Sequence, residues 1–168
     1  MNYKSIYIVG PTGVGKSDLA IDLALKLDTE VINTDSRLFY KGLDIGTSKP
    51  TKLDQVKVNH RLIDFLNPDD EFSLFEFLVQ CKQLTSGLRS KNMSPVLVGG
   101  SGQYYKALIE NWDVSEVPPD KKLRSKLNKF IEEEGVGEFY KKLIKTYPQN
   151  AINIDTKNPR RLIRAFEL

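Results

Sequence analysis

The chain has 168 residues, of which 40% are hydrophobic, so it can bury one core and falls within the usual size of a single domain. The lone Cys81 cannot form an internal disulfide, no secretory signal is visible, and no apolar run approaches the roughly eighteen residues of a membrane helix, so we expect a soluble, cytoplasmic protein. The formal net charge of +3 is unevenly spread, since residues 1–119 carry 13 Lys and Arg against 15 Asp and Glu, whereas residues 120–168 carry 12 against 7.

A glycine-rich loop close to the N-terminus fits the pattern G-x-x-x-x-G-K-[S/T]. Its residues are Gly10, Pro11, Thr12, Gly13, Val14, Gly15, Lys16 and Ser17. Such a loop directs backbone N–H groups and the start of a helix at a phosphate chain, while Lys16 adds a positive charge and Ser17 offers its hydroxyl to Mg²⁺. The flanks agree, because a β-branched and aromatic run at 5–9 precedes the loop and apolar residues recur at helical spacing from 19 to 27. We predict a phosphate-binding loop; the alternative is a glycine-rich turn that binds nothing.

A second short strand, at 30–34, delivers Asp35 and Ser36 to the same region. The carboxyl ends of the strands in an open parallel sheet line one crevice, so Asp35 should face the phosphate loop. From Leu38 to Pro68 the chain is rich in glycine and proline, with at best a short strand at 61–64. A connection of this length inside a compact domain is usually a lid or a binding loop.

Ser73 predicts the start of a helix with an apolar stripe, and residues 95–98 form a wholly apolar strand, a pattern typical of burial on both faces. This strand ends in Gly99-Gly100-Ser101-Gly102, and a further helix is expected at 103–110. Many phosphate-loop ATPases carry an acidic Mg²⁺-binding residue at the end of this strand, where Gly99-Gly100 stands here. The nearest carboxylate candidate is Asp35, which argues against an ordinary ATPase.

Residues 113–157 predict two amphipathic helices with basic outer faces, and Asn158-Pro159 predicts the start of another, with Arg160 and Arg164 on one face. The basic charge suits a polyanion, although charge alone favours a solvated helical surface. We predict an α/β fold, with a P-loop NTPase-like parallel sheet flanked by helices in residues 1–112 and a small helical insertion at 113–157. Residues 158–168 would begin a helix that returns to the core, with the C-terminal remainder absent, because three expected strands are few for such a sheet.

Several of these stretches, taken in order, resemble the tRNA dimethylallyltransferases, also called tRNA isopentenyltransferases. The resembling stretches are Gly10–Ser17, Asp35-Ser36, Tyr40–Pro50, His60 with Leu62–Asp64, Val98–Leu108 and Asn158–Ala165. The phosphate loop is common to many families, whereas the Gly42–Pro50 and Gly99–Leu108 blocks are specific to this one. The resemblance runs across essentially the whole chain.

The resemblance implies transfer of a dimethylallyl group from dimethylallyl diphosphate to N6 of the adenosine just 3′ of a tRNA anticodon, with Mg²⁺ as cofactor. It implies that residues 10–17 bind the diphosphate and that Ser17 binds the metal. Asp35, Ser101 and Arg164 would be catalytic, with Asp35 as the general base or hydrogen-bond acceptor for the attacking amine. The residues in contact with tRNA would be Asp35, Ser36, Arg37, Leu38, Ser101, Arg124, Arg160, Arg161 and Arg164. We expect a monomer with no membrane partner.

The sequence departs from the family at three places, since Leu38 stands where many relatives have Gln, Arg61 where His is usual and Ser101 where Thr is usual. Relatives also continue beyond this length. Two other functions stay open: a small-molecule or nucleotide kinase that uses ATP at the loop, and a truncated, inactive remnant that binds diphosphate or RNA. Structural roles are also open to the candidate residues, namely an N-cap for Asp35, a turn for Ser101 and a solvated helix face for the arginines.

Overall fold

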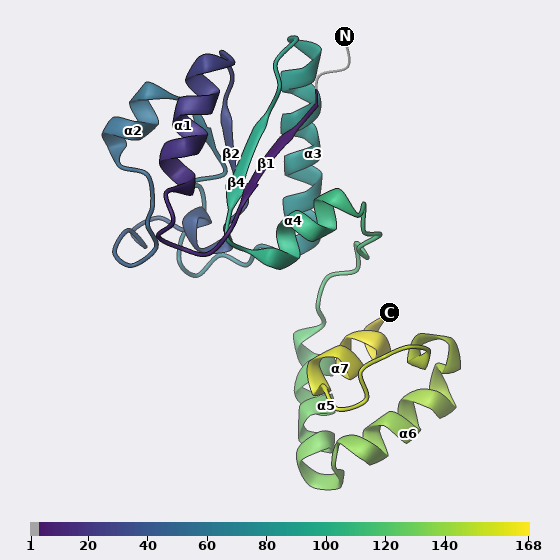
Figure 1. Ribbon diagram of the computed structural model, residues 1–168. Coiled ribbons are helices and arrows are strands. Elements are labelled where there is room, and N and C mark those ends of the chain that lie inside the picture. Colours follow the sequence, from purple (N-terminus) through teal and green to yellow (C-terminus); the bar gives the residue numbers. More distant parts are fainter. Residues whose placement is uncertain (1–3) are drawn as a thin grey trace. The chain divides into compact units, whose positions relative to one another are not determined.

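The computed structural model describes residues 4–168, which form two compact units. The first unit ends at Val114 and the second runs from Ser115 to Leu168 (Figure 1). Among residues 4–168, no helix is long and apolar enough to cross a lipid bilayer.

Within residues 4–114, four parallel strands form a sheet in the order β1-β4-β2-β3. The strands are β1 (Ile6–Val9), β2 (Val31–Asn33), β3 (His60–Arg61) and β4 (Val96–Gly99). In the register, Val98 of β4 lies opposite Ile8 of β1 on one side and Asn33 of β2 on the other. The sequence predicted β1, β2 and β4 as strands, and β3 overlaps the short strand expected at 61–64. The predicted parallel sheet is therefore confirmed.

Helices cover both faces of this sheet (Figure 1). They are α1 (Lys16–Lys26), α2 (Lys52–Lys57), α3 (Leu74–Ser90) and α4 (Gly102–Ile109). Because side chains alternate along a strand, Val31 and Val96 pack against α1, whereas Ile32 and Leu97 pack against α3 and α4. Cys81 of α3 is fully buried in this second layer, and burial raises the pKa of its thiol to about 12. The thiol therefore contributes to packing.

A single 3₁₀ turn, η1 (Ser36–Phe39), follows β2 and is held by aromatic packing. The Phe39 ring stacks on Phe77 of α3 and on Tyr104 of α4, with ring centroids 5.9 and 5.8 Å apart. Phe72 meets the same ring edge-on at 5.2 Å. Stacked and edge-on aromatic pairs are each worth about 0.5–1.5 kcal/mol beyond area burial. This packing fixes the segment that directly follows β2, and so fixes one wall of the site described below.

The second unit is wholly helical, with a core of its own. It contains α5 (Lys121–Glu134), α6 (Val136–Thr146), the 3₁₀ turn η2 (Pro148–Ala151) and α7 (Pro159–Glu167). Its core includes Leu127 of α5, Phe139 of α6 and Leu162 of α7. The helix start predicted at Asn158 is confirmed, because its side chain caps α7, and the side chain of Asp120 caps α5.

The unit boundaries differ from the predicted ones at both ends of the insertion. The division falls after Val114 instead of 112, and α7 belongs to the second unit. The apolar face of α7, including Leu162 and Ile163, is buried against α5 and α6. The predicted segment 158–168 therefore does not stand apart from the insertion. Sequence spacing shows that a helix has an apolar face but not which partner buries it.

Candidate functional site

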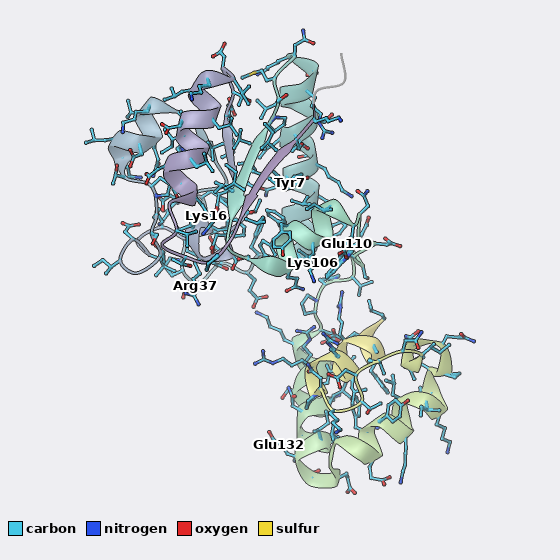
Figure 2. All side chains as sticks on the ribbon, viewed as in Figure 1. Tyr7, Lys16, Arg37, Lys106, Glu110 and Glu132 are labelled. Carbon is cyan, nitrogen blue, oxygen red and sulfur yellow. The ribbon has the colours of Figure 1, made fainter. Side chains whose placement is uncertain are left out.

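The phosphate loop connects β1 to α1 and has the backbone that its glycines permit. Gly13 and Gly15 have φ values of 84° and 81°, a left-handed conformation that side chains disfavour. Lys16 lies at the start of α1, and its Nζ donates to the carbonyl of Pro11 at 2.5 Å. Figure 2 shows Lys16 and Arg37 at the end of the first unit where the strands finish. The loop thus has the local geometry that the motif predicted.

Two helices begin at this end of the sheet without side-chain capping. The N-cap residues Gly15 of α1 and Ser101 of α4 make no side-chain capping hydrogen bond, whereas Thr51 and Ser73 cap α2 and α3 with reciprocal capping boxes. Uncapped first-turn N–H groups, together with the positive end of the helix dipole, favour an anion. The end of the sheet that carries the loop is therefore suited to phosphate.

A cavity of about 310 Å³ lies at the carboxyl ends of the strands. Its lining combines the phosphate loop, the ends of β2 and β4, and the segment before α2. The lining residues are Thr12, Gly13, Gly15, Lys16, Ser17, Asp18, Ile21, Asn33, Asp35, Leu38, Thr47, Ser48, Lys49, Pro50, Thr51, Asp54, His60, Ile63, Val98, Gly99 and Gly100. Asp35 and Lys16 share this cavity, as expected from the ends of parallel strands.

Asp35 follows β2 and caps η1. Its Oδ1 accepts from the N–H of Arg37 at 3.1 Å, and its Oδ2 accepts from the N–H of Gly100 at 3.3 Å. Both carboxylate oxygens are therefore held by backbone donors. The capping role that the sequence left open is real, and it coexists with a position in the cavity lining.

The glycines after β4 have a packing cause. A Cβ placed on Gly99 would lie 2.5 Å from the carbonyl carbon of Thr34 and 2.8 Å from the N of Asp35, both too close for real atoms. A Cβ on Gly100 would lie 3.2 Å from Oδ2 of Asp35. The end of β4 thus presses directly on the backbone that positions Asp35. An acidic residue at position 99 would not fit.

The other predicted residues of the first unit lie around this cavity in different ways. Leu38 is buried and lines it, whereas Arg37 is exposed. Ser101 joins η1, because its Oγ accepts from the N–H of Ser36 at 3.2 Å and lies 3.5 Å from the Ser36 hydroxyl. Ser36, Arg37 and Ser101 are not among the lining residues.

Lys49 is a lining residue that sequence reasoning passed over. Its side chain is only 4% exposed, and its Nζ donates to the Tyr40 carbonyl at 2.9 Å and to Asp64 at 2.5 Å, with Asp44 at 2.7 Å. Burial lowers the pKa of Lys49, but the hydrogen bonds and charges of Asp44 and Asp64 outweigh it and raise the pKa above its ordinary value. Lys49 therefore stays charged and anchors the loop between Tyr40 and Pro50. In the sequence, the only indication that Lys49 belongs to the site is its position in the family-specific Gly42–Pro50 block.

His60 also lines the cavity. Burial lowers the pKa of His60 below its ordinary value, so the ring is neutral near pH 7. Its Nδ1 lies 2.7 Å from the carbonyl of Val58, which can only accept, so Nδ1 carries the proton and Nε2 is left as an acceptor. The resemblance included His60 without giving it a role.

Arg124 and Arg164 share one buried carboxylate within the second unit. Arg124 binds Glu167 through two 2.7 Å hydrogen bonds, and Arg164 binds it at 3.2 Å while donating to the carbonyl of Val117 at 2.7 Å. The Glu167 side chain is 2% exposed, and the hydrogen bond from Arg124 is the main cause that lowers its pKa. Arg160 and Arg161 are exposed on α7. The candidate arginines thus fall into a tethered pair and an exposed pair.

The donor set suits Mg²⁺ only in part. Ser17 lines the cavity together with the carboxylates of Asp18 and Asp35, and Mg²⁺ prefers such oxygen ligands. Within residues 4–168, no group of three or more His, Cys, Asp or Glu side chains could hold a metal. A Mg²⁺ ion here fits if phosphate oxygens and water supply the remaining ligands, which is the usual arrangement at phosphate sites.

Comparison with known proteins gives one consistent result. A sequence model of the family described as IPP transferase matches residues 38–168. The chain is 43% identical to a tRNA dimethylallyltransferase of Herpetosiphon aurantiacus and 44% identical to one of Dehalococcoides mccartyi, in each case over 97% of this chain and 52% or 50% of the relative. The chain thus spans about half the length of these relatives.

Solved structures agree with the sequence comparison. The full-length tRNA isopentenylpyrophosphate transferase of Bacillus halodurans matches with a TM-score of 0.64 and 38% identity, over 99% of this chain and 55% of that one. A eukaryotic dimethylallyltransferase acting on tRNA matches with a TM-score of 0.77 and 29% identity, over 97% of this chain and 40% of that one.

Proposed function

The chain belongs to the IPP transferase family, and from this we propose that it transfers a dimethylallyl group from dimethylallyl diphosphate to N6 of the adenosine just 3′ of a tRNA anticodon, releasing diphosphate. The single observation that supports the proposal most is the shared cavity in which the phosphate loop and Asp35 meet. The proposal includes Mg²⁺ as cofactor, the cytoplasm as location and a monomer as the active form.

The loop end of the cavity suits the diphosphate. Backbone N–H groups of the loop, the uncapped start of α1 and the charge of Lys16 would bind the phosphate oxygens and stabilise the negative charge that grows on them as the C–O bond breaks. Mg²⁺, when bound by Ser17 and the diphosphate, supplies further neutralisation of that charge. The leaving group is thereby stabilised without an acidic residue at position 99.

The remaining lining suits the allyl group and the attacking amine. Apolar side chains from α1, η1 and β4 line the same cavity, among them Ile21, Leu38 and Val98, and would accept a short hydrocarbon chain. Asp35 would accept a hydrogen bond from N6 and then its proton. The N6 lone pair forms the new C–N bond, the C–O electron pair leaves with the diphosphate, and the proton goes to the Asp35 carboxylate.

The tRNA side of the proposal rests on the basic second unit. Arg160 and Arg161 are exposed, so they are better placed for phosphate contacts than Arg124 and Arg164, which bind Glu167. The target base would have to leave its stack to reach a cavity, as in other enzymes that modify bases. Arg164 keeps its proposed catalytic role only if diphosphate competes with Glu167 for its guanidinium.

A transfer assay tests the proposal on the full chain. The protein is incubated with dimethylallyl diphosphate labelled in the allyl group, Mg²⁺ and unmodified tRNA, and label in RNA is measured, with the Asp35→Ala variant beside it. We expect transfer without ATP, abolished by the substitution. A folded chain that binds diphosphate or RNA but transfers nothing would be a remnant, and ATP-dependent phosphorylation of a small molecule would make it a kinase; either outcome contradicts the proposal.

A further inference from the structure

Asn33, the last residue of β2, is a buried amide that the reaction as proposed does not use. It is 1% exposed and lines the cavity. A buried amide needs hydrogen-bond partners on both its oxygen and its nitrogen. Within the part of the chain that the structure describes, Asn33 has three such partners, all backbone groups, and two of them belong to Asp35.

The Asn33 side chain holds the backbone of Asp35 from both sides. Its Oδ1 accepts from the N–H of Asp35 at 2.9 Å, and its Nδ2 donates to the carbonyl of Asp35 at 2.9 Å. With both backbone groups tied to one side chain, the Cα–Cβ direction of Asp35 is fixed. The carboxylate then reaches the N–H groups of Arg37 and Gly100.

The same amide also holds the segment that follows β3. Its Nδ2 donates to the carbonyl of Leu62 at 2.8 Å. Leu62 has a φ of 60°, a left-handed backbone conformation that is unfavourable for a bulky residue such as leucine. The residues that follow are Ile63, which lines the cavity, and Asp64, which binds the ammonium of Lys49. Asn33 therefore connects Asp35 to the wall that anchors the loop before α2.

We propose that Asn33 is a positioning residue that sets the direction of the Asp35 carboxylate toward the attacking amine. The proposal rests on the proposed function in one respect, namely that Asp35 accepts the proton. An amide is required because only an amide offers an acceptor and two donors within one planar group of this size. A carboxylate would keep the acceptor but lose both donors, and an apolar side chain would lose all three.

The first test is Asn33→Asp, which keeps the side-chain shape. We expect kcat for transfer to fall by about tenfold or more, since small displacements of a catalytic group have effects of this size, while KM for dimethylallyl diphosphate stays within about twofold. The matched control is Asn59→Asp, the same change at an exposed residue whose Nδ2 donates to Glu30 outside the cavity. An unchanged kcat in Asn33→Asp would overturn the proposal.

The second test does not depend on transfer, so it separates this inference from the proposed function. In Asn33→Ala, the amide signals of Arg37 and Gly100 in an NMR spectrum should move toward their positions in Asp35→Ala, because both N–H groups donate to the Asp35 carboxylate. The Ile6 amide, bound to the Pro95 carbonyl at the start of β1, should stay. Unmoved Arg37 and Gly100 signals would overturn the proposal. Loss of folded structure in both Asn33→Asp and Asn33→Ala would also overturn it, because Asn33 would then be needed to hold the sheet together and its role would not be limited to Asp35.

Discussion

The two units differ in how they use their polar groups. In the first, α1 and α4 begin at Gly15 and Ser101 without side-chain caps at the end of the sheet where the cavity lies. In the second, Asp120 and Asn158 cap α5 and α7, whereas α6, which begins directly where α5 ends, and the 3₁₀ turn η2 have no side-chain cap. Helix ends left open beside a cavity are available to a ligand, whereas capped ends contribute to the unit's own stability.

The cationic side chains show the same difference. Lys16 donates to a carbonyl of its own loop and lines the cavity. Arg124 and Arg164 of the second unit converge on Glu167, which is buried and also accepts from the N–H of Asp120. The positive charge count of the second unit therefore overstates the charge that is available to the RNA of the proposed reaction. Among the arginines of the second unit, the exposed Arg160 and Arg161 of α7 are the ones whose charge is open to a polyanion.

The largest effect should come from Asp35→Asn, which tests whether the open site of the first unit performs the chemistry. Loss of a general base lowers rates by about 10²–10⁴-fold, so transfer should fall by that factor, whereas binding of inorganic diphosphate, followed by calorimetry, should change little. Asp22→Asn, an exposed change on α1, is the matched control. A parallel loss of diphosphate binding would show that Asp35 supports the loop instead.

The next effect concerns the close contact behind that site. Gly99→Ala places a Cβ against backbone atoms of Thr34 and Asp35, which cannot move aside as a side chain would, so we expect a loss of about 3 kcal/mol in the free energy of unfolding. Gly87→Ala in α3 is the control, because its Cβ meets no atom of residues 4–168 within 4 Å and alanine favours the helix by about 0.5–1 kcal/mol. Denaturant unfolding followed by circular dichroism measures both. Equal effects of the two substitutions would contradict the packing explanation.

Local signals explain why much of the fold and site could be predicted. The strand at Val96 is continuous apolar sequence, and Ser73 and Asn158 are side chains whose capping role needs only their neighbours. Asp35 followed from one topological rule, that parallel strands end at one crevice. Each of these inferences needed no knowledge of distant partners.

The rest depends on contacts between residues far apart in the chain. Lys49 is a binding partner of Asp64, and Asn33 of Leu62, across separations that no periodicity reveals. Glu167 looks like an ordinary exposed residue at the end of a basic helix, yet Arg124 buries it. Burial of a charge becomes visible only once the partner is in place.

Glu167→Gln tests whether the second unit is stabilised by this charge cluster. The substitution removes the charge to which two arginines donate, and hydrogen bonds to charged groups are worth about 1.5–3 kcal/mol, so we expect about 2 kcal/mol of destabilisation in α5–α7. Amide exchange of these helices measures it, with the exposed Glu138→Gln as control. Protection unchanged from the wild type would mean that the arginines are free to leave Glu167 without cost, and would raise the charge available to RNA.

The same cluster gives a pH dependence with a defined sign. The arginines hold the pKa of Glu167 below its ordinary value. The stabilisation that the Glu167 charge gives to the folded unit is therefore fully present above the unfolded pKa of about 4.3, and it is lost as the pH falls through the lower folded pKa. The melting temperature of the second unit should therefore fall as the pH decreases below the unfolded pKa, and fall less in Glu167→Gln. An identical decline in both proteins would assign the acid sensitivity to other carboxylates.

The smallest effect compares two serines at helix starts within the first unit. Ser73 accepts from the N–H of Glu76 at 3.2 Å, while Glu76 accepts from the Ser73 N–H at 2.7 Å, so Ser73→Ala should cost about 1 kcal/mol in the free energy of unfolding. Ser101→Ala removes no capping bond from α4, only the contacts of its Oγ with Ser36 at 3.2 and 3.5 Å. It should therefore cost less than the loss of the 2.7 and 3.2 Å bonds between the Ser73 hydroxyl and Glu76. Denaturant unfolding of both variants gives the ratio. If Ser101→Ala costs as much as Ser73→Ala, the bond from Ser36 to Ser101 stabilises the first unit as strongly as a helix cap, and the Ser101 hydroxyl serves the fold and not a ligand.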